Sequence, residues 1–199
     1  MISLTDIDLV LASTSAYRRD LLMRLTPKFR QRAPLVDEMP HPGELPEALA
    51  ARLAAAKARA VAAANPDALI VGSDQVADCE GLILGKPGNP KNARLQLRAS
   101  AGREVVFHTA ICLIDTRRSP ARETSAMDTT RVAFRRLDEG EIERYLAQEK
   151  PYDCAGSFKS EGLGISLFER IDSQDPTALI GLPLIALCQL LREAGIETV

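Results

Sequence analysis

The sequence has no excess of positive charge, because its 25 lysine and arginine residues are balanced by 27 aspartate and glutamate residues. A protein that binds nucleic acid or a membrane surface through its charge needs a broad basic field. The sequence also has no apolar run as long as a membrane span. We therefore expect neither a nucleic-acid partner nor a membrane, and any basic site must be local.

The cysteines and histidines form no metal or redox motif. The four cysteines are Cys79, Cys112, Cys154 and Cys188. Their spacing contains no CxxC pair and no Cys/His set of the kind that binds zinc. The first residues also lack the basic and apolar series of a secretion signal, which favours a cytoplasmic protein with free thiols. His41 and His108 are isolated, so we assign neither a catalytic role.

The 199 residues contain no internal repeat, low-complexity stretch or obvious linker, and they predict a single domain over residues 1–199. Apolar runs and turn signals predict strands at residues 9–12, 29–36, 68–72, 103–115, 123–134 and 165–171. Helices are expected at residues 46–64, 92–101, 139–148 and 181–191, and a hairpin at residues 76–85. This alternation indicates an α/β protein.

The chain is organised around its first apolar strand, residues 9–12, and the hydroxyl-rich turn at residues 13–15. Ser15 is a good N-cap for the helix that follows, and the free amides of a helix start attract anions. Arg18 and Arg19 add positive charge there, so a phosphate is the natural ligand. The alternative is an ordinary capped helix with two solvated arginines.

Two acidic positions stand out. Asp37 and Glu38 precede Pro40, which places them on a loop. They form either a solvated turn or a site at which Glu38 holds a divalent cation. Asp74 follows the strand predicted at residues 68–72, and acids at the end of a central strand are where α/β proteins usually carry chemistry.

Two lysines are candidates for phosphate binding. Lys57 lies four residues after Leu53, close to the apolar face of its predicted helix. It is either a lysine whose stem packs while its ammonium reaches water, or a phosphate ligand. Lys86 stands between Gly85 and Pro87, so a rigid loop presents it.

Together these positions suit a metal-bound polyphosphate, because cations neutralise phosphate oxygens while carboxylates hold a metal and activate water. The candidates are Ser13, Ser15, Arg18, Glu38, Lys57, Asp74, Lys86, Lys159 and Glu161.

The same motifs resemble the Maf family of nucleoside triphosphate pyrophosphatases. The resemblance covers residues 9–191, in the family's order. It rests on Leu11-Ala12-Ser13-x-Ser15-x-x-Arg18-Arg19-x-Leu21-Leu22, Asp37-Glu38, Lys57, Ser73-Asp74-Gln75, Gly85-Lys86-Pro87 and Gly181-Leu182-Pro183-Leu184. Gln75 and the segment Phe158-Lys159-Ser160-Glu161-Gly162 resemble the subfamily that hydrolyses 7-methyl-GTP.

The resemblance implies an elongated, mixed and twisted β-sheet flanked by helices, in two lobes around a central cleft. It also implies a divalent cation (Mg²⁺ or Mn²⁺), a homodimer, a cytoplasmic location, and the removal of modified nucleotides as the purpose. Asp74 matches the family's proton acceptor, and Tyr17, Gln75 and Glu161 match the positions associated with base choice. Two positions depart from the pattern, since Ala16 replaces a usual proline and Tyr17 replaces an expected tryptophan.

The chemistry of the base fits these positions. A 7-methylguanine ring is positively charged, so the face of Tyr17 attracts it by ~1 to 2 kcal/mol when desolvated. Glu161 can accept from both donors on the guanine edge, and Gln75 can donate to O6. The alternatives are a packing aromatic for Tyr17 and a solvated loop acid for Glu161.

We therefore expect the triphosphate to bind Ser13, Arg18, Lys57 and Lys86, with the metal on Glu38 and Asp74. Asp74 then accepts a proton from the water that attacks the α-phosphorus, giving 7-methyl-GMP and pyrophosphate. Two other functions stay open. The substrate could be another nucleotide, such as dTTP, UTP or a non-standard purine triphosphate, or the chain could be a nucleotide-binding regulator of septation.

Overall fold

The computed structural model describes residues 2–199, which form two compact units. The first unit comprises Met1–Asp74, Thr109–Asp128 and Asp175–Val199. The second comprises Gln75–His108 and Thr129–Gln174. No helix among residues 2–199 is both long and apolar enough to cross a membrane.

The main sheet is mixed, as the family resemblance implies. Its strands are β2 (Leu9–Ala12), β3 (Arg30–Arg32), β4 (Leu69–Cys79), β5 (Leu82–Leu84), β6 (Glu104–Asp115), β7 (Arg122–Phe134) and β8 (Phe168–Asp172). The hydrogen-bonded order is β3-β2-β4-β6-β7-β8, and β5 pairs with β4. Strand β2 runs parallel to β3 and β4, whereas β5 and β8 pair antiparallel with β4 and β7.

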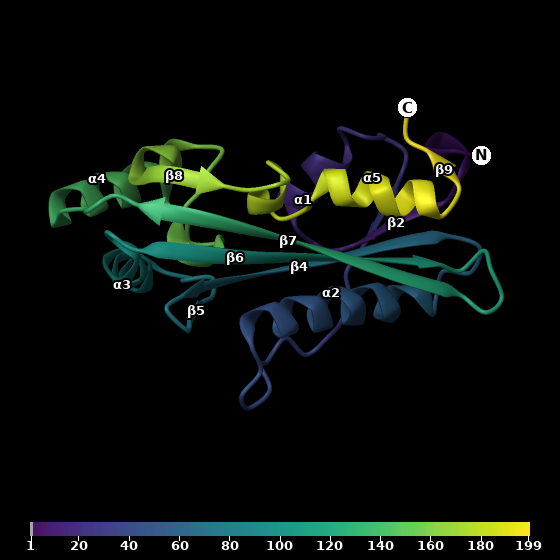
Figure 1. Ribbon diagram of the computed structural model, residues 1–199, viewed down its shortest axis with the longest axis horizontal. Coiled ribbons are helices and arrows are strands. Elements are labelled where there is room, and N and C mark those ends of the chain that lie inside the picture. The colour runs from purple at the N-terminus through teal and green to yellow at the C-terminus, as the bar shows by residue number, and fades with distance from the viewer. Residues whose placement is uncertain (1) are drawn as a thin grey trace. The chain divides into compact units, whose positions relative to one another are not determined.

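In the first unit, helices cover both faces of the sheet. Helix α2 (Pro46–Ala62) lies on one face, and α1 (Ala16–Leu22) and α5 (Leu184–Glu193) lie on the other (Figure 1). Every residue of β2 is therefore buried, which explains why it reads as a continuous apolar run rather than as an alternating one. Leu9 and Leu11 belong to the same core cluster as Leu22 and Leu187.

Helix α2 approaches β4 unusually closely. A Cβ atom on Gly72 would lie 2.3 Å from the carbonyl oxygen of Ala54 and 2.7 Å from the amide nitrogen of Ala58. Glycine on the strand and alanines one turn apart on the helix are what permits this approach. The contact fixes the middle of α2 beside β4, and Lys57 lies in that part of the helix.

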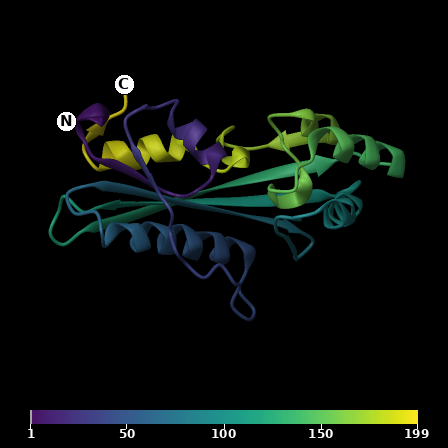
Figure 2. The same ribbon diagram turned by 180° about the vertical axis from the view of Figure 1, so that it is seen from behind.

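The ends of the described chain also meet in the first unit. Strand β1 (Ile2–Ser3) pairs in parallel with β9 (Ile196–Glu197), which brings the two termini together (Figure 2). This pair is not predicted from the sequence, because two-residue strands carry no periodic signal.

The second unit contains α3 (Pro90–Ser100) and α4 (Glu139–Glu149). Asp138 caps α4, and its carboxylate and that of Glu141 satisfy each other's backbone amides in a capping box. Four phenylalanines pack edge to face with ring centroids 4.8 to 5.5 Å apart. They are Phe107, Phe134, Phe158 and Phe168.

Residues 2–199 also contain four short 3-10 helices. They span Leu4–Asp6, Ala155–Ser157, Leu163–Leu167 and Ala178–Ile180.

Most predicted elements occur within two or three residues of their predicted positions, but two strands differ. The strand predicted at residues 29–36 contains only Arg30–Arg32, because the segment after it forms neither helix nor strand. The strand predicted to stop at Gly72 continues as β4 to Cys79. Ser73 can remain in the buried ladder because its hydroxyl has backbone acceptors, the carbonyl oxygens of Ala110 and Gly181.

Candidate active site

The candidate site of the first unit begins where β2 ends. Ala12 is the last residue of β2 and pairs with Gly72 of β4. Asp74 lies two residues beyond that pair, so it projects from β4 past the carboxyl end of its parallel neighbour. The prediction that β4 ends before Asp74 is wrong, yet Asp74 still lies at the edge where parallel sheets carry ligands.

The turn after β2 is held by its own serines. The hydroxyl oxygen of Ser13 accepts from the amide of Ser15 at 3.1 Å, and the hydroxyl oxygen of Ser15 accepts from the amide of Arg18 at 3.3 Å. The predicted N-cap is therefore confirmed. Each hydroxyl uses its oxygen as an acceptor in these bonds, which leaves its O–H able to donate to an anion.

Arg18 lies in the first turn of α1, and the backbone of a glycine fixes its side chain. Its Nε donates to the carbonyl oxygen of Gly181 at 2.7 Å. Gly181 has a φ of +123°, which side-chain-bearing residues rarely adopt. Burial lowers the pKa of Arg18, and the negative charges of Asp74 and Glu38 act in the opposite direction. A guanidinium stays protonated through such a shift, so Arg18 presents a fixed positive charge beside two carboxylates.

Lys57 joins the two predicted carboxylates. Its Nζ lies 2.5 Å from Oδ1 of Asp74 and 2.6 Å from Oε1 of Glu38. The side chains of Lys57 and Asp74 are only 7% and 10% exposed, whereas that of Glu38 is 61% exposed. The ammonium therefore does not reach out to bulk water, and the snorkelling alternative is excluded. Three elements far apart in the sequence converge on one nitrogen atom.

The carboxylates of Glu38 and Asp74 supply only part of the coordination that a divalent cation needs. No cluster of three or more His, Cys, Asp or Glu side chains that could hold a metal occurs among residues 2–199. Glu38 and Asp74 nonetheless offer two carboxylates within reach of one point. Mg²⁺ is typically bound by one or two carboxylates, substrate phosphates and water. The remaining ligands of such an ion would have to be phosphate oxygens and water.

The predicted specificity residue of this unit is Tyr17. It lies in the first turn of α1, directly before Arg18, and its side chain is partly buried. The helix begins at Ala16, so the absence of the usual proline does not prevent its start.

The other predicted residues belong to the second unit. Gln75 follows Asp74 on β4 and is partly buried, whereas Lys86 is exposed in the segment between β5 and α3. Lys159 has its Nζ 4.0 Å from the carboxylate of Glu149, and Glu161 is exposed and accepts from Ser160 at 3.3 Å. Their proposed roles stay predictions.

The turn that carries Glu161 is tightly built. The amide of Lys159 donates to the hydroxyl of Tyr145 at 3.1 Å, and the amide of Leu163 donates to Glu149 at 2.7 Å. A Cβ on Gly164 would lie 2.3 Å from the carbonyl oxygen of Lys159, so glycine is required there. The second unit thus holds this segment in one conformation.

Four contributors to the first unit's site are not predicted from the sequence as site residues. The carbonyl oxygen of Gly181 accepts from Nε of Arg18 and from the hydroxyl of Ser73, and the motifs of Ser73 and Gly181 stand out in the sequence only through the family resemblance. Arg52 and Glu44, which fasten the segment bearing Glu38, carried no signal, because an arginine on a helix and an acid in a loop are usually solvated.

Comparisons with known proteins identify the family. The family model described as "Maf-like protein" matches residues 8–194. A "7-methyl-GTP pyrophosphatase" of Xanthomonas oryzae pv. oryzae is 62% identical over 187 residues, which is 94% of this chain and 96% of that protein. Proteins of the same name are 56% identical in a Polaromonas species, covering 94% of this chain and 85% of that protein, and 54% identical in Nitrosospira multiformis, covering 96% of both.

Solved structures support the fold alone. The Staphylococcus aureus Ham1 protein has a TM-score of 0.52 at 14% identity, covering 94% of this chain and 99% of its own. A HAM1 protein from Coxiella burnetii has a TM-score of 0.51 at the same identity and coverage. The mixed sheet flanked by helices is thus shared with Ham1 proteins, and the match over residues 8–194 shows that the chain belongs to the Maf family.

Proposed function

We propose that this chain hydrolyses 7-methyl-GTP between its α- and β-phosphates, giving 7-methyl-GMP and pyrophosphate. Relatives that are 54 to 62% identical over nearly the whole chain bear the name of this activity. One structural observation carries the chemistry, namely the meeting of Glu38 and Asp74 on the ammonium of Lys57. The cytoplasmic location and the homodimer stay predictions from the family resemblance.

In the first unit, the phosphates are bound by the turn after β2 and by two cations. Ser13 and Ser15 supply hydroxyl donors, and Arg18 supplies a guanidinium whose position Gly181 fixes. Lys57 supplies a buried ammonium, which contacts the two carboxylates. A mostly desolvated cation interacts more strongly with phosphate than one in bulk water does.

Glu38 and Asp74 are the residues that would hold a divalent cation, Mg²⁺ or Mn²⁺. Such an ion, when bound, neutralises charge on the phosphates. The ammonium of Lys57 keeps the two carboxylates converged, since it contacts both.

Asp74 accepts the proton of the attacking water. Its carboxylate is oriented by the ion pair with Lys57 and lies at the carboxyl end of β2, next to the phosphate-binding turn. A base must lie within hydrogen-bond reach of the proton that it removes. Asp74 would take this role for a water molecule placed opposite the pyrophosphate leaving group.

Tyr17 receives the methylated base. The cationic 7-methylguanine ring is attracted to the face of an aromatic side chain, and Tyr17 is adjacent to the phosphate-binding Arg18. Gln75 and Glu161 read the guanine edge and Lys86 binds phosphate, as the family resemblance implies. Lys159 stays a further candidate.

Isotope labelling tests the reaction. The purified protein is incubated with 7-methyl-GTP and Mg²⁺ in ¹⁸O-water, and the products are analysed by mass spectrometry. We expect ¹⁸O in 7-methyl-GMP and none in pyrophosphate, because water attacks the α-phosphorus. Release of orthophosphate, ¹⁸O in pyrophosphate, or no turnover would contradict the proposal.

A panel of nucleotides tests the substrate. The value of kcat/KM should be highest for 7-methyl-GTP among 7-methyl-GTP, GTP, dTTP, UTP and ITP. If dTTP or UTP ranked first, the pyrophosphatase activity would stand and the assignment of the base would fall.

A further inference from the structure

The segment that carries Glu38 is not held by apolar burial. Residues 33–45, between β3 and α2, form neither helix nor strand. Three of their large apolar side chains face water, with exposed fractions of 93% for Leu35, 70% for Met39 and 61% for Leu45. Glu38 nevertheless reaches Nζ of Lys57 at 2.6 Å. Some other interaction must therefore hold the segment in place.

That interaction comes from Arg52 on α2. Its Nε and Nη2 donate to the two carboxylate oxygens of Glu44 at 2.6 and 2.8 Å, and Nη2 also donates to the carbonyl oxygen of Met39 at 3.0 Å. The carboxylate of Glu44 in turn accepts from the amide of His41 at 2.9 Å. One guanidinium and one carboxylate thus fix residues 39, 41 and 44, beginning directly after Glu38.

Arg52 and Glu44 form a charged pair at neutral pH. The hydrogen bond from Arg52, followed by that from the amide of His41, lowers the pKa of Glu44 to about 2. The same contact raises the pKa of Arg52. The two parallel N–H···O bonds are charge-assisted, which is the strongest common form of a side-chain hydrogen bond. Both groups therefore stay ionised wherever the enzyme is assayed.

We infer that the Arg52–Glu44 pair is a positioning pair, which sets the place of Glu38 relative to Lys57 and so governs how the metal and the triphosphate bind. The inference rests on the proposed function, because it takes its meaning from the role of Glu38 there. Arg52 and Glu44 act through Glu38 and need no contact with the reacting atoms. A displacement of about 1 Å in such a group can reduce the rate by about 100-fold.

Helix α2 offers a matched control. Arg59, two turns after Arg52, makes the same two-pronged contact with Glu123, at 2.8 and 2.7 Å. The Arg59 side chain is 64% exposed, and its partner is on β7 rather than on the segment of Glu38. Loss of the Arg59 pair therefore removes a similar interaction from the same helix without releasing Glu38.

The first experiment compares Arg52→Ala, Arg52→Lys, Glu44→Gln and Arg59→Ala. For each protein, kcat and KM for 7-methyl-GTP are measured over a range of Mg²⁺ concentrations. Hydrogen exchange is followed for the backbone amides of residues 35–45. We expect Arg52→Ala to lower kcat/KM by about 10- to 100-fold, to require more Mg²⁺ for half-maximal rate, and to exchange faster at residues 39–44.

The other variants test whether the loss of activity follows the contacts that each one removes. Lysine keeps the charge but cannot bond to Glu44 and Met39 as a fork, so Arg52→Lys should be intermediate. Glu44→Gln should follow the same direction, and it serves as the second probe if Arg52→Ala does not fold. Arg59→Ala should stay within about twofold of the wild type in kcat/KM, with unchanged exchange at residues 35–45. Equal losses for Arg52→Ala and Arg59→Ala would overturn the inference.

A double-mutant cycle separates this inference from the proposed function. If Arg52 acts through Glu38, then Arg52→Ala should cost less than about twofold in a Glu38→Ala background. A loss of the same size in both backgrounds would overturn the inference. Full activity of Glu38→Ala would instead overturn the proposed role of Glu38, and with it the inference. An impaired Glu38→Ala beside a fully active Arg52→Ala overturns the inference alone.

Discussion

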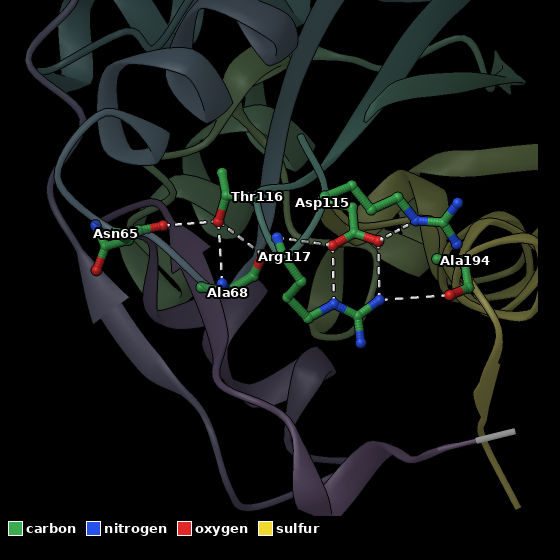
Figure 3. A network of polar contacts seen from close by, with 7 residues as sticks. Asn65, Ala68, Asp115, Thr116, Arg117 and Ala194 are labelled. Carbon is green, nitrogen blue, oxygen red and sulfur yellow. Dashed lines mark hydrogen bonds and ion pairs between the residues drawn. The ribbon is translucent and has the colours of Figure 1, made fainter. Parts of the chain in front are cut away.

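The first unit contains two buried aspartates paired with cations, and they differ in where their partners come from. Asp115 ends β6, and its carboxylate accepts from the amide, Nε and Nη2 of Arg117 and from Nε of Arg118 (Figure 3). All of these donors lie two or three residues away in the chain. Asp74 instead pairs with Lys57, seventeen residues away on a helix that packs across the sheet.

The neighbouring contacts of the two aspartates differ as well. Arg117 also donates to the carbonyl oxygen of Ala194 at 3.4 Å, which fastens the turn after β6 to the end of α5. Beside it, the hydroxyl of Thr116 bonds to the backbone of Asn65 and Ala68 (Figure 3). The oxygens of Asp115 are thus committed to local structure. The ammonium of Lys57 is instead shared between two carboxylates, those of Glu38 and Asp74, which lie far from it in the sequence.

The largest effect should come from Asp74→Asn. The amide is nearly isosteric but cannot accept a proton, so kcat for 7-methyl-GTP should fall by about 10³-fold. Steady-state kinetics measures the loss, and thermal melting checks the fold. Asp115→Asn is the matched control, and its kcat per folded molecule should equal that of the wild type. An active Asp74→Asn enzyme would remove Asp74 from the role of base.

Lys57→Met should have the next largest effect. Methionine keeps much of the apolar stem and removes the ammonium, so Glu38 and Asp74 lose the group that holds them together. We expect kcat/KM to fall by about 100-fold, as for the loss of one well-placed donor to a developing charge. Arg117→Ala, which removes a partly buried cation from the other aspartate, should leave kcat/KM of the folded enzyme unchanged. Equal losses in the two variants would erase the distinction between the sites.

The sequence allows much of this contrast to be predicted, but not all of it. The position of Ser15 as an N-cap and the buried run of β2 follow from local rules, and the structure confirms both. The contact between Lys57 and Asp74 does not, because it depends on how closely α2 packs against Gly72. Composition shows the alanines that allow this approach, but only tertiary packing decides which way a lysine beside them points.

The same reasoning explains the missed residues. Arg52 and Glu44 look like solvated surface charges in the sequence, and only the conformation of residues 33–45 reveals that they hold Glu38. The pair Arg117 and Asp115 was also not singled out, although its two-residue spacing makes it local. The spacing predicts that such a pair can form. Only the structure shows that the carboxylate is buried, which makes the pair important for stability.

Asp115→Asn should destabilise the protein without harming the chemistry. The Asp115 side chain is 3% exposed, and asparagine would replace one of its two acceptor oxygens by an NH2 group that faces arginine donors, and would remove the negative charge. We expect the free energy of unfolding to fall by about 2 kcal/mol. Urea denaturation measures the change, and Arg118→Ala, which removes a side chain that is 51% exposed, should cost less. Equal stability of Asp115→Asn and the wild type would show that the network is not structural.

The smallest expected effect is the pH dependence of the difference in unfolding free energy between the wild type and Asp115→Asn. Burial by itself would raise the pKa of Asp115, but the hydrogen bonds and charge of Arg117, with those of Arg118, outweigh it and lower the pKa. A carboxyl whose pKa is lower in the folded state stabilises that state above its unfolded value, about 3.9. The stability gap between the wild type and Asp115→Asn should therefore be constant from pH 6 to 8 and should shrink as the pH falls below about 4. Urea denaturation at each pH measures the gap, and a gap that widened on acidification would mean that Asp115 is stabilised in its protonated form, contrary to the network in Figure 3.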